Sequence, residues 1–196
     1  TFDRDPRKSV PRFIAFAIPF GWILDPKKFN IGLDLAISKI KRISPNSVDP
    51  RVKNYHWLDL VNGMYEAYDR GHYTAVLVDE ENNVLEGPGF NIFSLSENGL
   101  ITPDKGVLEG ITRQTAIDLA EELEIPVKEA PISSNLFKNS LEAFATSTAG
   151  GIIPITKIDD IVIGNGKIGK YTKLIKDLYW EKHKDPSWSI NIDELL

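Results

Sequence analysis

At residues 49–57 the chain reads DPRVKNYHW, an extended stretch with a proline that gives way to a helical pattern. Lys53 lies at this transition. A primary amine held there can form an imine with an aldehyde. Most lysines are solvated surface charges, so Lys53 alone predicts no chemistry. Its importance depends on what the rest of the chain can place beside it.

A second stretch, LEGPGFNI at residues 85–92, places the carboxylate of Glu86 just before two glycines. Glycines let a ligand or another backbone segment approach closely. A carboxylate in such a place can hold the protonated nitrogen of a pyridine ring. The alternative is an ordinary hairpin acid beside turn glycines.

Two more stretches are candidates for binding an anion. In GVLEGITR, residues 106–113, a helix is predicted to start near Thr112, and free amides at a helix start attract phosphate. In TSTAGG, residues 146–151, hydroxyls and amides follow a predicted strand. The alternatives are a common threonine N-cap and a simple turn. Taken together, the four stretches meet the three needs of pyridoxal phosphate: a lysine, a partner for the ring nitrogen and a phosphate cup.

Composition narrows the function classes. The chain has 196 residues, 42% of them hydrophobic, which suits one domain with a substantial core or at most two small ones. Its net charge of -5 disfavours nucleic acid as a partner. It has no cysteine, and its three histidines lack metal-ligand spacing, so we expect neither disulfides nor a metal site. No apolar run approaches the roughly 20 residues of a membrane span, and we expect a cytoplasmic protein.

The periodicity of apolar residues predicts strands in hairpin-sized steps, with fewer helices. The expected strands are residues 12–22, 31–43, 73–78, 84–86, 91–95, 100–102, a short one from 127, 141–146 and 152–156. The expected helices are residues 57–70, one from 112, 133–137 and 171–179. This order predicts a mixed α/β or α+β domain and not a doubly wound sheet.

The order of these stretches and their amino-acid sequences resemble those of a known protein family. The runs DPRVKNYHWLDLVNGMYEAYDRG, VLEGPGFNI, TPDKGVLEGITR and TSTAGGIIPIT are similar to those of the fold-type IV, or class IV, aminotransferases that use pyridoxal phosphate. This family includes branched-chain and D-amino-acid aminotransferases and aminodeoxychorismate lyase, and the resemblance is greatest to the (R)-selective amine transaminases. It implies a barrel-like mixed sheet flanked by helices.

The resemblance also implies a role for individual residues. Lys53 would be the Schiff-base lysine and the proton shuttle, and Glu86 would pair with the pyridine nitrogen. The other expected cofactor contacts are Leu108 on the ring face, and Ile111, Thr112, Ser147 and Thr148 around the phosphate. The expected substrate pocket consists of Trp57, Pro88, Thr148 and Ala149. Pro88 departs from the smaller residue typical of the family at that position.

Family members carry a smaller N-terminal domain that supplies a phosphate-binding arginine and one wall of the pocket, and they act as dimers. By this resemblance we expect residues 1–12 to be a linker or a cut loop from such a domain. We expect residues 13–196 to be the large cofactor-binding domain, and the protein to form a homodimer or a higher oligomer.

The leading interpretation is a transaminase that moves an amino group between an amine or amino acid and a 2-oxo acid. Within the family, a branched-chain aminotransferase is the nearest alternative and aminodeoxychorismate lyase a more distant one. From a different class, the chain could be an inactive domain that only binds pyridoxal phosphate or self-associates. An α/β domain with coincidental motifs is the remaining alternative.

Overall fold

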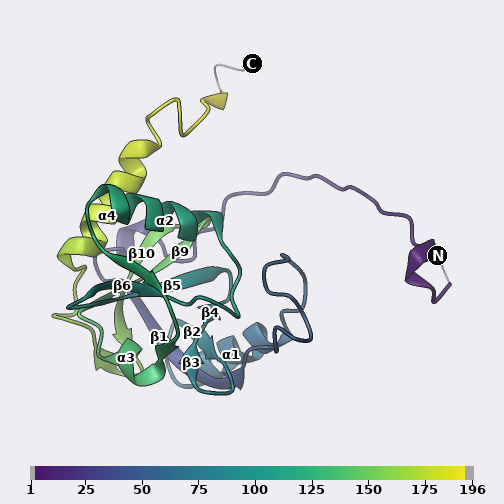
Figure 1. Cartoon of the computed structure of the whole chain (residues 1–196), viewed down its shortest axis with the longest axis horizontal. Coiled ribbons are helices and arrows are strands. Elements are labelled where there is room, and N and C mark those ends of the chain that lie inside the picture. Colours follow the sequence, from purple (N-terminus) through teal and green to yellow (C-terminus); the bar gives the residue numbers. More distant parts are fainter. Residues whose placement is uncertain (1–2, 193–196) are drawn as a thin grey trace.

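The structure is a computed structural model that describes residues 3–192. Its centre is one mixed sheet in the order β7-β6-β5-β9-β10-β1-β2-β3-β8, with β4 paired to β5 and β11 paired to β10 (Figure 1). The strands are β1 (Leu33–Lys41), β2 (Thr74–Val78), β3 (Asn83–Val84), β4 (Glu86–Gly87), β5 (Phe90–Ser96), β6 (Gly99–Thr102), β7 (Val127–Glu129), β8 (Ile132–Ser133), β9 (Glu142–Ser147), β10 (Gly151–Ile158) and β11 (Ile161–Val162). The helices are α1 (Leu58–Asp69), α2 (Ile111–Glu122), α3 (Ser134–Lys138) and α4 (Lys170–Lys182).

The sheet combines hairpins with crossover connections. Strand β1 runs parallel to both β10 and β2, and β6 runs parallel to β7. The other pairs are antiparallel, including β5 with β9 and β9 with β10. The expected mixed sheet flanked by helices is therefore confirmed.

The inner face of the sheet holds the largest apolar cluster. Val76 of β2, Ile92 of β5 and Ile153 of β10 all belong to it, although β2 and β5 lie four places apart in the sheet order. The sheet must curl for these strands to share one core. Figure 1 shows this curl, with α2 and α4 on one side of the molecule and α1 and α3 on the other.

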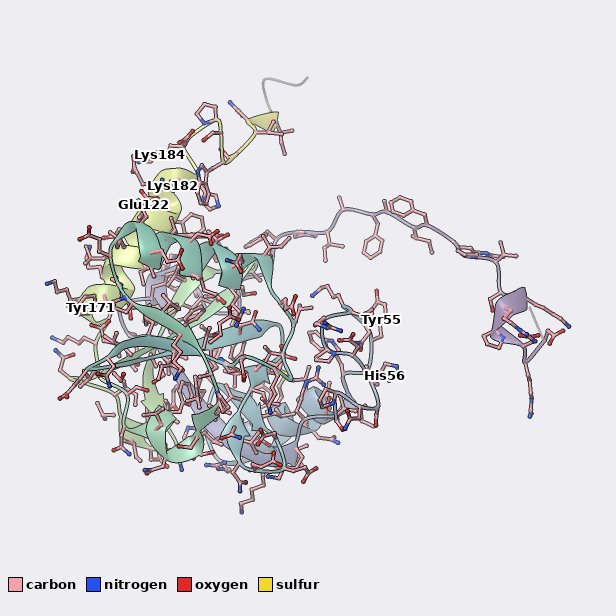
Figure 2. All side chains as sticks on the ribbon, in the orientation of Figure 1. Tyr55, His56, Glu122, Tyr171, Lys182 and Lys184 are labelled. Carbon is pink, nitrogen blue, oxygen red and sulfur yellow. The ribbon has the colours of Figure 1, made fainter. Side chains whose placement is uncertain are left out.

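Helices α1, α2 and α4 cover the opposite face, whereas α3 places Phe137 in the inner cluster. Successive strand residues point to opposite faces, so Phe93 and Phe144 lie outside the curl and stack at 4.7 Å between ring centroids beneath α2 and α4. Helix α1 packs separately on β1 and β2 through Leu60. An ion pair of 2.8 Å between Lys182 and Glu122 joins α4 to α2 (Figure 2). Among residues 3–192, no helix is long and apolar enough to cross a bilayer.

One predicted strand is wrong. Residues 12–22 form no strand; they run as an exposed, extended segment that leads away from the body toward the N-terminus (Figure 1). The side chains of Phe13 and Phe16 are 93% and 79% exposed. An apolar, aromatic-rich run needs a neighbouring strand edge to form a sheet, and the described part of the chain offers none here. The first buried residue of the body is Leu24.

Candidate active site

The four stretches singled out in the sequence meet around one cavity of about 620 Å³. It lies between the loop before α1, the turn from β4 to β5, the start of α2 and the end of β9. The predicted site residues that line it are Lys53, Trp57, Glu86, Leu108, Ile111, Thr112, Ser147, Thr148 and Ala149. Pro88 is the one predicted pocket residue that does not line the cavity.

Lys53 lies on the loop that precedes α1 and is exposed. Figure 2 shows Tyr55 and His56 on this loop, which stands off from the sheet, and Tyr55 is fully exposed. Trp57 is the N-cap of α1, so the helix begins only a few residues after the lysine. Lys53 therefore lines the cavity from an exposed loop, whereas the buried Glu86 lines it from strand β4.

Glu86 is the buried acid of the site, with only 6% of the residue exposed. Its Oε1 accepts a hydrogen bond from Nε of Arg42 at 3.1 Å, and Nη2 of the same guanidinium is also 3.1 Å away. Its Oε2 accepts the amide N–H of Leu108 at 3.0 Å. Burial raises the pKa of Glu86, and the Leu108 amide and the Arg42 charge oppose this effect.

Arg42 is a site residue that the sequence analysis missed. It directly follows β1, lines the cavity, and donates from Nη1 to Oδ2 of Asp59 at 2.7 Å. Its side chain is only 7% exposed. A buried arginine requires carboxylate partners, but the sequence does not indicate which of its distant carboxylates lie beside it. The available signal was weak: Arg42 directly follows a strand that already carries Lys39 and Lys41.

The anion end of the cavity is the start of α2. The helix begins at Ile111, one residue before the position expected, and no described side chain caps it. Its first amides therefore remain open to a ligand. Asn91 positions the segment that leads into the helix, because its Nδ2 donates to the carbonyl of Leu108 at 2.8 Å. A Cβ added at Gly110 would come within 2.4 Å of Oδ1 of Asn91. Asn91 is a second residue that the sequence analysis did not assign to the site.

The hydroxyls at the end of β9 differ in what they can offer. Ser147 donates its hydroxyl proton to the carbonyl of Gly89 at 2.8 Å and accepts the amide of Ala149 at 3.1 Å. Thr146 also lines the cavity and is only 2% exposed. Its Oγ1 is buried without a hydrogen-bond partner within residues 3–192. Because Thr146 pairs with Asn91 across the sheet, both side chains lie on the face toward α2.

The fold and this site define a class of protein. The chain belongs to the class IV aminotransferases, whose family model matches residues 2–158. The membership expected from the four sequence runs is thus confirmed. Within residues 3–192, no three histidine, aspartate or glutamate side chains converge as metal ligands would.

Relatives by sequence include a putative branched-chain-amino-acid aminotransferase of Methanocaldococcus jannaschii, 34% identical over 193 residues. The branched-chain-amino-acid aminotransferase of Escherichia coli strain K12 is 33% identical over 172 residues. The alignments cover 96% and 85% of this chain, but only 64% and 55% of these relatives. The chain thus spans between about half and two thirds of their length.

The solved structures similar to this chain include further branched-chain aminotransferases. The branched-chain amino acid aminotransferase of Thermobaculum terrenum, in its PLP form, has a TM-score of 0.77 at 31% identity, covering 82% of this chain and 56% of that one. The branched-chain aminotransferase of Thermoproteus uzoniensis with norvaline has a TM-score of 0.78 at 32% identity, covering 87% of this chain and 58% of that one.

Proposed function

We propose that this chain is the cofactor-binding part of a pyridoxal-phosphate-dependent aminotransferase. The observation that carries the proposal is one cavity lined by a lysine at its rim, a buried glutamate within it and an open helix start. These are the three kinds of group that the cofactor requires. The four motifs come from separate parts of the sequence, and only the fold brings them to one place.

The residues of the cavity fit the cofactor. The buried hydroxyl of Thr146 lacks a partner within residues 3–192, and the first amides of α2 have no side-chain cap there. Both features leave donors for a phosphate group. When bound, pyridoxal phosphate supplies an aldehyde that joins an amine and a ring that accepts electrons from the bond being broken.

The residues of this chain then have distinct tasks. Glu86 would hold the ring nitrogen, and Leu108 would pack on the ring. Lys53 would hold the aldehyde, and as a free amine it would carry the proton that passes between the substrate carbon and the cofactor. Ile111, Thr112, Ser147 and Thr148 complete the phosphate cup. Ser147 would contribute through nearby backbone amides, because its own hydroxyl proton is already donated to the carbonyl of Gly89.

The substrate pair is an amine or amino acid and a 2-oxo acid, with Trp57, Thr148 and Ala149 facing it. The relatives described above are branched-chain aminotransferases, and this slightly favours that alternative over the (R)-selective amine transaminases. We keep as further proposals a homodimer, a cytoplasmic location, a linker over residues 1–12 and a large domain over 13–196.

The test is the near-ultraviolet and visible absorbance of the purified chain titrated with pyridoxal phosphate. Lys53→Ala is measured beside it, with Lys128→Ala as the control for loss of an exposed lysine outside the cavity. We expect a visible band that is lost in Lys53→Ala and kept in Lys128→Ala. A band that survives in Lys53→Ala, or no band at all, contradicts the proposal. A Lys53-dependent band that no amine or amino acid bleaches would indicate a domain that binds the cofactor without transferring an amino group.

A further inference from the structure

Three charged residues with largely buried side chains form a chain behind the cavity: Asp59, Arg42 and Glu86. Oδ2 of Asp59 lies 2.7 Å from Nη1 of Arg42, and Oε1 of Glu86 lies 3.1 Å from Nη2. The three side chains are 14%, 7% and 8% exposed. They come from the first turn of α1, the end of β1 and the short strand β4, so the contact joins three separate elements.

Backbone groups fix both ends of this chain. Oδ2 of Asp59 also accepts the amide of Ile43 at 2.7 Å, and its Oδ1 accepts the amide of Leu60 at 2.8 Å. Glu86 accepts the amide of Leu108. The guanidinium of Arg42 is divided between the two carboxylates, and it cannot rotate toward one without losing the other.

The lone pairs of Glu86 leave room for one more donor. A carboxylate accepts about four hydrogen bonds, two on each oxygen. Arg42 approaches Oε1 through Nε and Nη2, and the Leu108 amide takes one place on Oε2. The open place on Oε2 could accept a further donor, such as a ring N–H bound in the cavity that Glu86 lines.

The charges of the three residues do not cancel. An arginine side chain stays protonated, so Arg42 alone would neutralise Glu86. A protonated ring nitrogen would then face a neutral pair in a buried site, which is unfavourable. Asp59 restores a net negative charge to the group. The other ionisable side chains that line the cavity are Lys53 and Glu109.

We propose that Asp59 and Arg42 are positioning residues for Glu86: Arg42 fixes its orientation and keeps it ionised, and Asp59 supplies the surplus negative charge that holds a proton on a pyridine nitrogen bound against it. This inference rests on the proposed function, because it assigns residues to the site of the ring. Neither residue needs to touch the cofactor's reacting atoms for this role.

The first measurement is the ¹⁵N chemical shift of ring-labelled pyridoxal phosphate bound to the chain, followed against pH. Asp59→Asn keeps the shape and one acceptor but removes the charge. We expect it to lower the pH at which the ring nitrogen loses its proton by roughly one unit. Asp49→Asn is the matched control, since it removes the same charge from the nearby loop, where Asp49 pairs with Arg51. Asp59→Glu should restore most of the wild-type value.

The second measurement needs no cofactor. The ¹³C carboxyl shift of Glu86, assigned with Glu86→Gln, is titrated in the chain alone. We expect Asp59→Asn to lower the pKa of Glu86, because the carboxylate of Asp59 opposes its ionisation. If Asp59→Asn lowers the pKa of Glu86 but the chain binds no cofactor, the charge coupling is supported and the proposed function is contradicted. Binding with both titrations unchanged in Asp59→Asn would overturn the inference and leave the proposed function standing. If Asp59→Asn does not fold, the ring-nitrogen titration is measured in Asp59→Glu instead. If the ring nitrogen bound to Asp59→Glu loses its proton at the same pH as in free pyridoxal phosphate, the inference is overturned.

Discussion

The amide of Leu108 donates a hydrogen bond of 3.0 Å to Oε2 of Glu86, and this contact ties the loop before α2 to strand β4. This contact therefore fixes the position of the buried Glu86 relative to the uncapped start of α2. Asn91 adds a second tie, from β5 to the carbonyl of the same Leu108. The geometry of the cavity thus depends on contacts between segments far apart in the sequence.

The raised pKa of Glu86 predicts a pH-dependent stability. Its ordinary value is 4.5, and burial raises it in the folded chain. The folded state therefore binds this proton more tightly than the unfolded state does. The stability that Glu86 contributes is fully present below pH 4.5 and is lost as the pH rises through its folded pKa.

Urea denaturation at a series of pH values tests this expectation. The stability of the wild-type chain relative to Glu86→Gln should fall as the pH rises above 4.5. Glu121→Gln, at an exposed position of α2, is the control and should show no such trend. A wild-type advantage that grows with pH would show that Arg42 outweighs burial and that the pKa is in fact lowered.

The unpartnered hydroxyl of Thr146 predicts that its removal stabilises the chain without cofactor. A buried hydroxyl without a hydrogen bond destabilises a fold by about 1–3 kcal/mol. Thr146→Val should therefore raise the free energy of unfolding by about 1 kcal/mol. Thr102→Val is the matched control: Thr102 is equally buried, but its Oγ1 donates to the carbonyl of Ile92 at 2.8 Å, so this change should destabilise. Equal losses in both variants would show that Thr146 has a partner, such as a buried water.

The close approach of Gly110 to Asn91 predicts a coupled pair. A Cβ at Gly110 would come within 2.4 Å of Oδ1 of Asn91, although the backbone φ of -66° suits any residue. Gly110→Ala should therefore destabilise by about 1–3 kcal/mol through overpacking. In an Asn91→Ala background the same change should be nearly neutral. Additive effects in this double-mutant cycle would show that the clash is not the cause.

The N-terminal segment should contribute little to stability. Phe16→Ala removes a side chain that is 79% exposed, and we expect a change in unfolding free energy of less than about 0.5 kcal/mol. Phe144→Ala removes a fully buried ring stacked on Phe93, and should destabilise by about 3–5 kcal/mol. Thermal or chemical denaturation of the two variants gives the comparison. A large loss in Phe16→Ala would mean that the segment packs against something in solution.

The sequence was most informative where the signal is local. The apolar spacing from Leu60 predicts α1, and Gly71, which has a φ of +81°, follows its end, where a left-handed residue is favoured. The apolar run at residues 12–22 failed as a strand because pairing requires a partner edge, which no local pattern reports. Most strands and helices were placed within a few residues of their bounds.

The site was predictable only in part. Lys53 and Glu86 lie in motifs whose glycines and flanking residues carry the resemblance, and they line one cavity as expected. Arg42 was missed because its partners are distant in sequence: Asp59 lies on helix α1, which connects β1 to β2, and Glu86 lies on the short strand β4. Thr146 was passed over for Ser147 because only the strand register shows which of two adjacent hydroxyls is already bonded.

Covalent labelling of Lys53 tests the central claim most directly. The chain is mixed with pyridoxal phosphate, reduced with borohydride and digested, and the labelled peptides are identified by mass. The account predicts that label at low cofactor concentration is confined to the peptide containing Lys53, and that Glu86→Gln raises the concentration needed. Label spread over the exposed lysines, with no preference for Lys53, would contradict it.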